Sequence, residues 1–107
     1  IYQYRRDRGE TFFKPVAYSV SKSALFNLTR YLAAYWAKSG VRINTLVIAG
    51  VQRNQDQQFL NAYNSRIPIG RMAKSNEYNG TIIYMLSKAS EYMTGSTLTI
   101  DGGWTCI

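Results

Sequence analysis

Residues 41–49 constrain the fold of this chain more than any other stretch. Beyond Arg42 and Asn44 the run is almost continuously apolar and rich in β-branched residues, and Gly50 follows it directly. Alternating polarity would indicate one buried face, whereas a continuous apolar run of this length is typical of a strand buried on both faces, as in a parallel sheet. The run therefore predicts a strand that needs neighbours on either side.

A long helix is predicted before this strand, over residues 16–39. Pro15 suits its first turn, and Gly40 after Lys38 suits a left-handed residue at its end. Apolar residues recur through the segment at spacings of three and four, which is the period of one helix face. These residues are Ala17, Val20, Ala24, Leu25, Leu28, Leu32 and Tyr35.

Two more helices and a second strand are predicted after residue 50. A polar segment, 52–64, holds a short helix that presents Phe59, Leu60 and Tyr63 on one side, and a loop with proline and glycine covers 66–72. Ser75 is predicted to cap a further helix that has Glu77 in its first turn and runs to about Lys88. Its one buried stripe is predicted to be Ile82, Ile83, Met85 and Leu86, and residues 96–100 form the second strand, closed by Asp101-Gly102-Gly103.

The order helix, strand, helix, helix, strand indicates the α/β class, because parallel strands need a crossover connection. Two strands alone do not make a stable open sheet with helices on it. Residues 1–107 are therefore predicted to be one incomplete domain, the C-terminal part of a larger sheet. Within it, residues 1–14 are predicted to be a loop or insertion.

The charge and the scarce metal ligands limit the classes of partner. The net charge is +7, but beyond the basic N-terminal third the lysines and arginines are scattered, and no helix has a basic stripe with interleaved aromatics. That argues against a nucleic-acid surface. The absence of histidine and a single cysteine, Cys106, argue against a metal site. The lone cysteine and the lack of an apolar run of about 20 residues indicate a cytoplasmic protein without a membrane partner.

Tyr18 and Lys22 are the candidate catalytic pair. They lie four residues apart at the start of the first predicted helix, so their polar ends share one face. A tyrosine hydroxyl ordinarily titrates near 10, and a cation about 4 Å away stabilises a phenolate by roughly 4 kcal/mol at an effective dielectric of about 20. The pair can therefore supply a general acid/base near neutral pH. By itself the spacing also fits an ordinary helix start.

Several short motifs in consistent order, from about residue 15 to 105, resemble the short-chain dehydrogenase/reductase superfamily. Each motif is short, and their order and register make the resemblance specific. The matching residues are Tyr18-Ser19-Val20-Ser21-Lys22-Ser23-Ala24, Leu28-Thr29-Arg30, Leu32-Ala33, Gly40-Val41-Arg42-Ile43-Asn44, Ile67-Pro68-Ile69-Gly70-Arg71-Met72, Gly80, Leu86-Ser87-Lys88-Ala89-Ser90, Thr94-Gly95 and Ile100-Asp101-Gly102-Gly103-Trp104.

The resemblance implies the C-terminal portion of a Rossmann-like, doubly wound parallel sheet and an oxidoreductase that interconverts an alcohol and a carbonyl with NAD or NADP. Tyr18 matches the tyrosine that exchanges a proton with the substrate oxygen. Lys22 matches the lysine that activates that tyrosine and binds the nicotinamide ribose. Val51 falls where the family's backbone contacts the nicotinamide carboxamide, and Asn44 matches a structural residue that ties the strand to neighbouring loops. The resemblance also implies a homo-oligomer with contacts through the 16–39 helix and through the C-terminal helix and strand.

Three departures qualify the resemblance. The family's glycine-rich dinucleotide turn is absent from the chain, and Arg5 stands where the common pattern has a serine, so a catalytic serine is either lost or displaced upstream by a longer loop. Ile48-Ala49 replaces the family's Pro-Gly. Arg53 replaces a threonine, where it is either a phosphate or carboxylate ligand or, as we expect, a solvated surface residue.

These departures leave a second interpretation, a non-catalytic binding or oligomerisation module that keeps the fold. On the enzyme interpretation the isolated chain is expected to be inactive, because the adenosine half of the cofactor has no site in it. The substrate and the choice between NAD and NADP are not encoded in the motifs. The stretch 1–14 resembles insertions in members linked to surface-sugar synthesis, which makes a sugar-linked alcohol the first guess.

Overall fold

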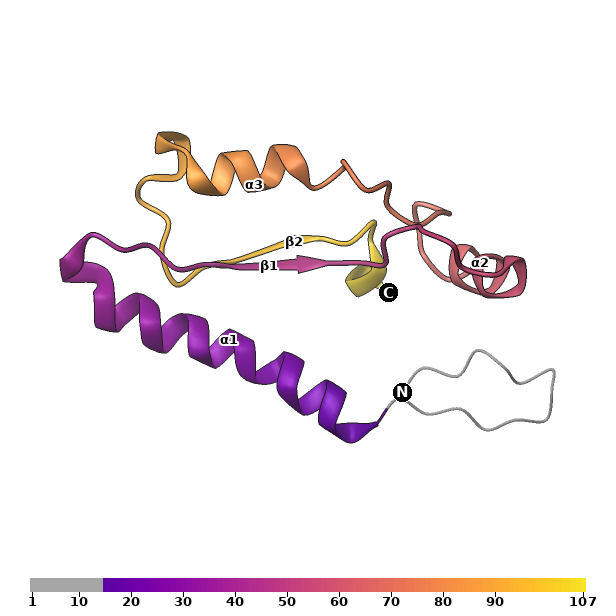
Figure 1. The fold of residues 1–107 in the computed structure, drawn as a ribbon, viewed down its shortest axis with the longest axis horizontal. Helices are drawn as coiled ribbons and strands as arrows, with labels where there is room; N and C mark the ends of the chain where they lie inside the picture. The colour runs from indigo at the N-terminus through magenta and orange to yellow at the C-terminus, as the bar shows by residue number, and fades with distance from the viewer. Residues whose placement is uncertain (1–14) are drawn as a thin grey trace.

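The computed structural model of the chain describes residues 15–107 (Figure 1). The predicted loop or insertion at 1–14, with Arg5 at the serine position, lies outside the described residues. The α-helices are α1 (Val16–Trp36), α2 (Gln57–Asn64) and α3 (Asn79–Leu86), and the strands are β1 (Thr45–Ile48) and β2 (Thr97–Ile100). Short 3-10 turns cover Ala37–Ser39, Lys88–Ser90 and Trp104–Cys106. This is the predicted α/β order.

The two strands form a parallel pair, as predicted. Thr45 pairs with Thr97 and Ile48 with Ile100, in a continuous register. α1 and α3 cover opposite sides of this sheet in Figure 1, with α3 in the connection between the strands. Within residues 15–107, β1 pairs only with β2, so its other edge faces no strand of the described part.

The first helix ends earlier than residue 39. The α-helical part stops at Trp36, and a 3-10 turn carries the chain through Ser39. Gly40 then adopts the expected left-handed conformation, with φ 75°, and its N–H donates to the Ala37 carbonyl. The predicted segment is therefore right in position, and its last turn is tightened.

Ser75 does not cap the third helix, so that prediction is wrong. α3 begins at Asn79, and no side chain caps it. Glu77, expected in the first helical turn, instead accepts hydrogen bonds from Arg71 (2.7 Å to each carboxylate oxygen) and from the Lys74 N–H (2.6 Å). These contacts hold residues 74–77 in a turn, so the helix begins only at Asn79.

The hydrophobic core of residues 15–107 is small. Tyr63, Ile67 and Met72 are its buried members, with partly buried residues around them: Ala49, Phe59, Leu60 and Trp104. The ring of Tyr63 stacks against both Phe59 and Trp104, at centroid distances of 5.9 and 4.8 Å. Asp56 caps α2 by accepting the Phe59 N–H at 2.8 Å, and so orients this aromatic cluster.

Two predictions of burial, for β1 and for one face of α3, are wrong within residues 15–107. β1 is only partly buried, and Ile48 is 49% exposed. The expected buried stripe of α3 is largely exposed, with Ile83 at 67% and Leu86 at 79%. The cause is the same in both cases, since no described segment covers these surfaces.

The amino end of β1 is fastened to the end of α3 by two polar side chains. The Arg42 guanidinium donates to the carbonyls of Met85 (2.8 Å), Ser90 (2.9 Å) and Met93 (3.0 Å). Asn44 donates to the Met93 carbonyl and accepts the Ser96 N–H, at 2.9 and 3.0 Å. The predicted structural role of Asn44 is thereby confirmed.

None of the helices in residues 15–107 combines the length and apolar character needed to cross a bilayer.

Candidate active site

Tyr18 and Lys22 lie one turn apart in the first part of α1. The Lys22 Nζ lies 5.8 Å from the centroid of the Tyr18 ring, so the two side chains share one helix face, as the spacing predicts. Both are exposed on the described part of the chain, Tyr18 to 48%. The Ser21 hydroxyl donates to the Tyr18 carbonyl at 2.9 Å and is thus occupied within the helix.

The start of α1 lies at the same end of the sheet as the carboxyl ends of the strands. α1 runs opposite to β1 in Figure 1, so the turn with Tyr18 and Lys22 lies towards the end where β1 gives way to the loop at Gly50. Open α/β sheets bind ligands outside the carboxyl ends of their strands. The predicted pair is therefore at the end of the sheet where such sites form.

The loop after β1 is held to the segment before α3 by a parallel bridge between Val51 and Ala73. The Ala73 N–H donates to the Gly50 carbonyl at 3.0 Å, and the Gln52 N–H donates to the Ala73 carbonyl at 2.8 Å. In such a bridge the N–H and C=O of the middle residue point to the opposite side. The polar groups of Val51 thus point away from Ala73.

Val51 keeps a free backbone donor on that side. Its carbonyl accepts the Gln55 side-chain amide at 3.0 Å, whereas its N–H donates to no acceptor within residues 15–107. A free N–H just beyond a strand end suits a carboxamide oxygen, which is the contact expected here for nicotinamide. The residues present therefore fit the cofactor that the sequence predicts.

Gly50 allows this loop to approach the Met72 and Tyr63 side chains closely, although the chain lacks the family's Pro-Gly pair at residues 48–49. A Cβ at Gly50 would lie 2.6 Å from the Met72 Cε and 3.0 Å from the Tyr63 ring. The Gly50 N–H donates to the Tyr63 hydroxyl at 2.7 Å. The departure at Ile48-Ala49 thus leaves a glycine in the loop, two residues after the position of the missing proline.

Arg53 is exposed and presents no anion site with its described neighbours. Its backbone N–H donates to the Gln55 Oε1 at 2.6 Å. The structure agrees with the expected solvated surface arginine. Gln55 and Tyr63, which shape the loop, were missed as site residues from the sequence, because a glutamine and a tyrosine in a polar segment give no signal of their contacts.

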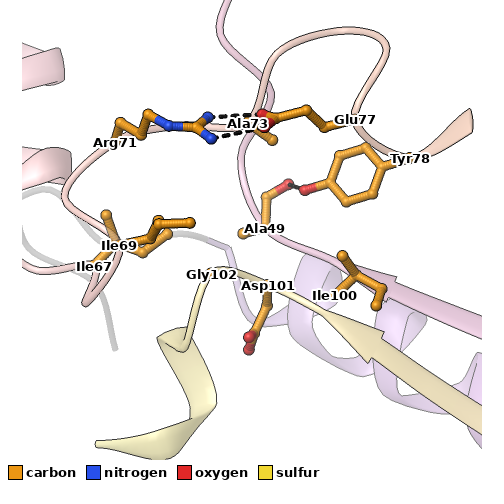
Figure 2. A pocket seen from close by; sticks show the side chains of 10 residues that line it. All are labelled: Ala49, Ile67, Ile69, Arg71, Ala73, Glu77, Tyr78, Ile100, Asp101 and Gly102. Atoms are coloured by element: carbon orange, nitrogen blue, oxygen red, sulfur yellow. Dashed lines mark hydrogen bonds and ion pairs between the residues drawn. The ribbon is translucent and has the colours of Figure 1, made fainter. Parts of the chain in front are cut away.

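A cavity of about 180 Å³ lies beside the carboxyl ends of both strands (Figure 2). Its walls are mostly apolar, and its lining residues are Ala49, Ile67, Ile69, Arg71, Ala73, Glu77, Tyr78, Ile100, Asp101 and Gly102. Tyr18, Lys22 and Val51 are not among them. The cavity is therefore separate from the predicted site residues, and it was not predicted from the sequence.

The polar side chains that line the cavity each have a hydrogen-bond partner. The hydrogen bond from Arg71 lowers the pKa of Glu77 to about 2. Burial raises the pKa of Tyr78, whose hydroxyl donates to the Ala49 carbonyl at 3.4 Å. The Thr105 hydroxyl lowers the pKa of Asp101. Across residues 15–107 no three histidine, cysteine or acidic side chains gather where they could hold a metal ion.

Comparison with known proteins identifies the family. The family model described as enoyl-(acyl carrier protein) reductase matches residues 6–105. The chain is 39% identical over 97 residues to the D-arabinitol 2-dehydrogenase [ribulose-forming] of Scheffersomyces stipitis, covering 83% of this chain and 35% of that protein. It is likewise 39% identical over 94 residues to a tropinone reductase homolog of Arabidopsis thaliana, covering 82% and 36%.

A solved structure agrees with these relatives. The short-chain dehydrogenase from Leptospira borgpetersenii, determined with bound NAD+, matches with a TM-score of 0.82 and 36% identity over 88% of this chain and 37% of that one. The chain thus spans about a third of the length of the proteins it matches. On these matches, and on the α/β architecture with its parallel strands, the chain belongs to the short-chain dehydrogenase/reductase superfamily of oxidoreductases.

Proposed function

We propose that the full-length protein containing this chain is an NAD- or NADP-dependent oxidoreductase that interconverts an alcohol and a carbonyl by hydride transfer. The observation that carries the proposal is the position of Tyr18, Lys22 and Val51. The first two lie at the start of α1, towards the carboxyl end of β1, and Val51 presents a free N–H just beyond that strand.

Each of these residues has one task in the proposed reaction. The Tyr18 hydroxyl exchanges a proton with the substrate oxygen, as general acid in reduction and general base in oxidation. The Lys22 ammonium stabilises the tyrosinate formed when that proton is given up and binds the nicotinamide ribose. The Val51 N–H orients the nicotinamide through its carboxamide. A bound nicotinamide supplies or accepts the hydride.

The proposal is tested by titrating the full-length protein with NADH and with NADPH while following the fluorescence of the reduced nicotinamide. Saturable binding of either cofactor below millimolar concentration, followed by its oxidation on addition of a carbonyl substrate, supports the proposal. Saturable binding without turnover over a broad alcohol and carbonyl panel favours a non-catalytic module. No binding at millimolar concentration of either cofactor rejects the enzyme function.

Polyols and the matching keto sugars form the first substrate panel, because one relative is named for the oxidation of D-arabinitol to ribulose. The guess of a sugar-linked alcohol points to the same class. The isolated 107-residue chain serves as the inactive control, since we propose that it lacks the adenosine site.

A homo-oligomer is part of the same proposal. Large apolar side chains left exposed on α1 and α3 support it, with Tyr31 and Tyr35 exposed to 66% and 67% and Leu86 to 79%. Copies of the full-length protein would cover some of these side chains. Size-exclusion chromatography with light scattering would then give a mass of two or more copies, and a monomer at micromolar concentration would reject the assembly.

A further inference from the structure

The side-chain amide of Gln55 binds the loop after β1 at two points. Its Nε2 donates to the Val51 carbonyl at 3.0 Å, and its Oε1 accepts the Arg53 N–H at 2.6 Å. Both ends of one amide are thereby used, and Gln55 is partly buried. The contacts are local, because the side chain binds backbone groups two and four residues before it in the sequence.

The neighbouring peptide groups are held by other partners. The Tyr63 hydroxyl accepts the Gly50 N–H at 2.7 Å, and Ala73 binds the Gly50 carbonyl and the Gln52 N–H. Gln55 adds the Val51 carbonyl and the Arg53 N–H. The peptide planes from residue 49 to residue 53 are therefore each anchored by at least one hydrogen bond.

The Val51 N–H is the exception in this stretch, since within residues 15–107 it has no acceptor. It lies on the same side of the backbone as the carbonyl that Gln55 holds, because both point away from Ala73. The loop thus presents one unpaired donor next to a fixed carbonyl. The donor belongs to the 50–51 peptide, which Ala73 holds through the Gly50 carbonyl, and the fixed carbonyl belongs to the 51–52 peptide, which Gln55 holds. Both peptides that flank Val51 are therefore restrained.

We infer that Gln55 is a positioning residue for the nicotinamide, acting through the Val51 amide. The inference rests on the proposed function and adds to it a residue that contacts neither cofactor nor substrate. By holding the Val51 carbonyl and the Arg53 N–H, Gln55 fixes the two peptides that follow Val51 and so keeps the loop in the shape that presents the Val51 N–H to the carboxamide. A pre-oriented donor binds more tightly than one that must be ordered on binding.

The experiment compares the full-length protein with three variants. Gln55→Leu removes both contacts of the amide. Gln55→Glu retains an acceptor for the Arg53 N–H but loses the donor to the Val51 carbonyl. Gln57→Leu is the matched control, because the Gln57 amide donates at 2.8 Å to Asn61, a contact within α2.

Two dissociation constants are measured for each protein, one for the reduced cofactor that binds better and one for the corresponding ADP-ribose, which lacks nicotinamide. We expect Gln55→Leu and Gln55→Glu to weaken cofactor binding about fivefold to tenfold. Binding of the ADP-ribose and the melting temperature are expected to stay near wild type. The KM for the cofactor should rise in both Gln55 variants with a smaller change in kcat. Gln57→Leu should leave KM, kcat and both dissociation constants unchanged.

Equal weakening of the cofactor and of the ADP-ribose would overturn the inference, because it would indicate a general structural role. Unchanged cofactor binding in both Gln55 variants would overturn it as well, while the proposed function would stand on the wild-type binding. If the wild-type protein binds the ADP-ribose but gains nothing from nicotinamide, the inference and the proposed function both fail.

Discussion

β1 is held in different ways at its two ends. At the amino end, Arg42 and Asn44 fasten the strand to the end of α3 and to the entrance of β2, and their side-chain groups are used within the protein. At the carboxyl end, the loop from Gly50 is equally well anchored, yet it leaves the Val51 N–H without an acceptor in residues 15–107. The polar groups at the first end are thus paired within the protein, whereas the second end keeps a free donor, where we propose that the cofactor binds.

The two ends of a short strand can differ in this way, one fixing the fold and the other leaving a donor free. Parallel sheets place the carboxyl ends of their strands together, so a free donor there meets groups from other elements. The first turns of α1, which carry Tyr18 and Lys22, lie towards the same end of the sheet in Figure 1, although α1 contacts the strand elsewhere, where the Thr29 and Thr45 hydroxyls lie 2.7 Å apart. Changes at the two ends should then separate folding from chemistry.

The largest effect is expected at Tyr18. Tyr18→Phe removes the proposed general acid/base and should lower kcat of the full-length protein by about 10²–10⁴-fold, with little change in cofactor affinity. Tyr92→Phe is the matched control, because Tyr92 is fully exposed and precedes Met93, the carbonyl partner of Arg42 and Asn44 at the amino end. Steady-state kinetics of both variants check the prediction. A Tyr18→Phe enzyme with wild-type kcat would remove the catalytic assignment.

The amino end should give the largest loss of stability. Arg42→Leu removes charge-assisted hydrogen bonds to four carbonyls, including a long one of 3.5 Å to Ser87, and should lower the free energy of unfolding by about 2–3 kcal/mol. Arg53→Leu at the carboxyl end, where the side chain is exposed, should change it little. Chemical denaturation of the full-length protein measures both. Equal effects would show that the two ends do not differ in this respect.

A smaller loss is expected from Gly50→Ala, by about 1–2 kcal/mol, because the added methyl group meets the Met72 side chain and the Tyr63 ring. The same change should also weaken cofactor binding, since it displaces the loop. Gly80→Ala in α3 is the control, because a Cβ there meets nothing within 4 Å and alanine favours a helix. Denaturation and cofactor titration are both required. A stable Gly50→Ala variant with normal affinity would contradict the close packing described.

The smallest effect is expected from the ion pair of Arg71 and Glu77. The pKa of Glu77 is lowered to about 2, so its contribution to stability is present above its ordinary pKa of 4.5 and is lost as the pH falls towards 2. Glu77→Gln should therefore lower the melting temperature at pH 6 but have less effect at pH 3. Glu91→Gln, which lacks this partner, is the control. A difference between Glu77→Gln and wild type that stays constant over this range would exclude the ion pair as its cause.

Local patterns in the sequence predicted most of the fold. The apolar period gave α1, Gly40 marked its end, and the β-branched runs placed both strands of the parallel pair. The start of α3 could not be predicted, because it depends on a contact between Glu77 and Arg71 across a turn. The exposure of Ile48 and Leu86 was also missed, because an apolar pattern does not reveal whether another segment covers it, and none of the described segments covers these two side chains.

The residues of the candidate site were likewise predicted only where the sequence has a local pattern. Tyr18 and Lys22 are recognisable because a helix places residues four apart on one face. Gln55 and Tyr63 reach the loop through contacts over 2–4 and 13 residues, with no repeating pattern to reveal them. The choice between NAD and NADP follows from neither set.

We expect the carboxyl end of β1 to hold the nicotinamide, and a crystal structure of the full-length protein with its bound cofactor would show whether it does. In that structure the Val51 N–H should donate to the carboxamide oxygen at about 2.7–3.2 Å, with Tyr18 and Lys22 facing the nicotinamide riboside. A carboxamide bound elsewhere, with the Val51 N–H still unpaired, would contradict it.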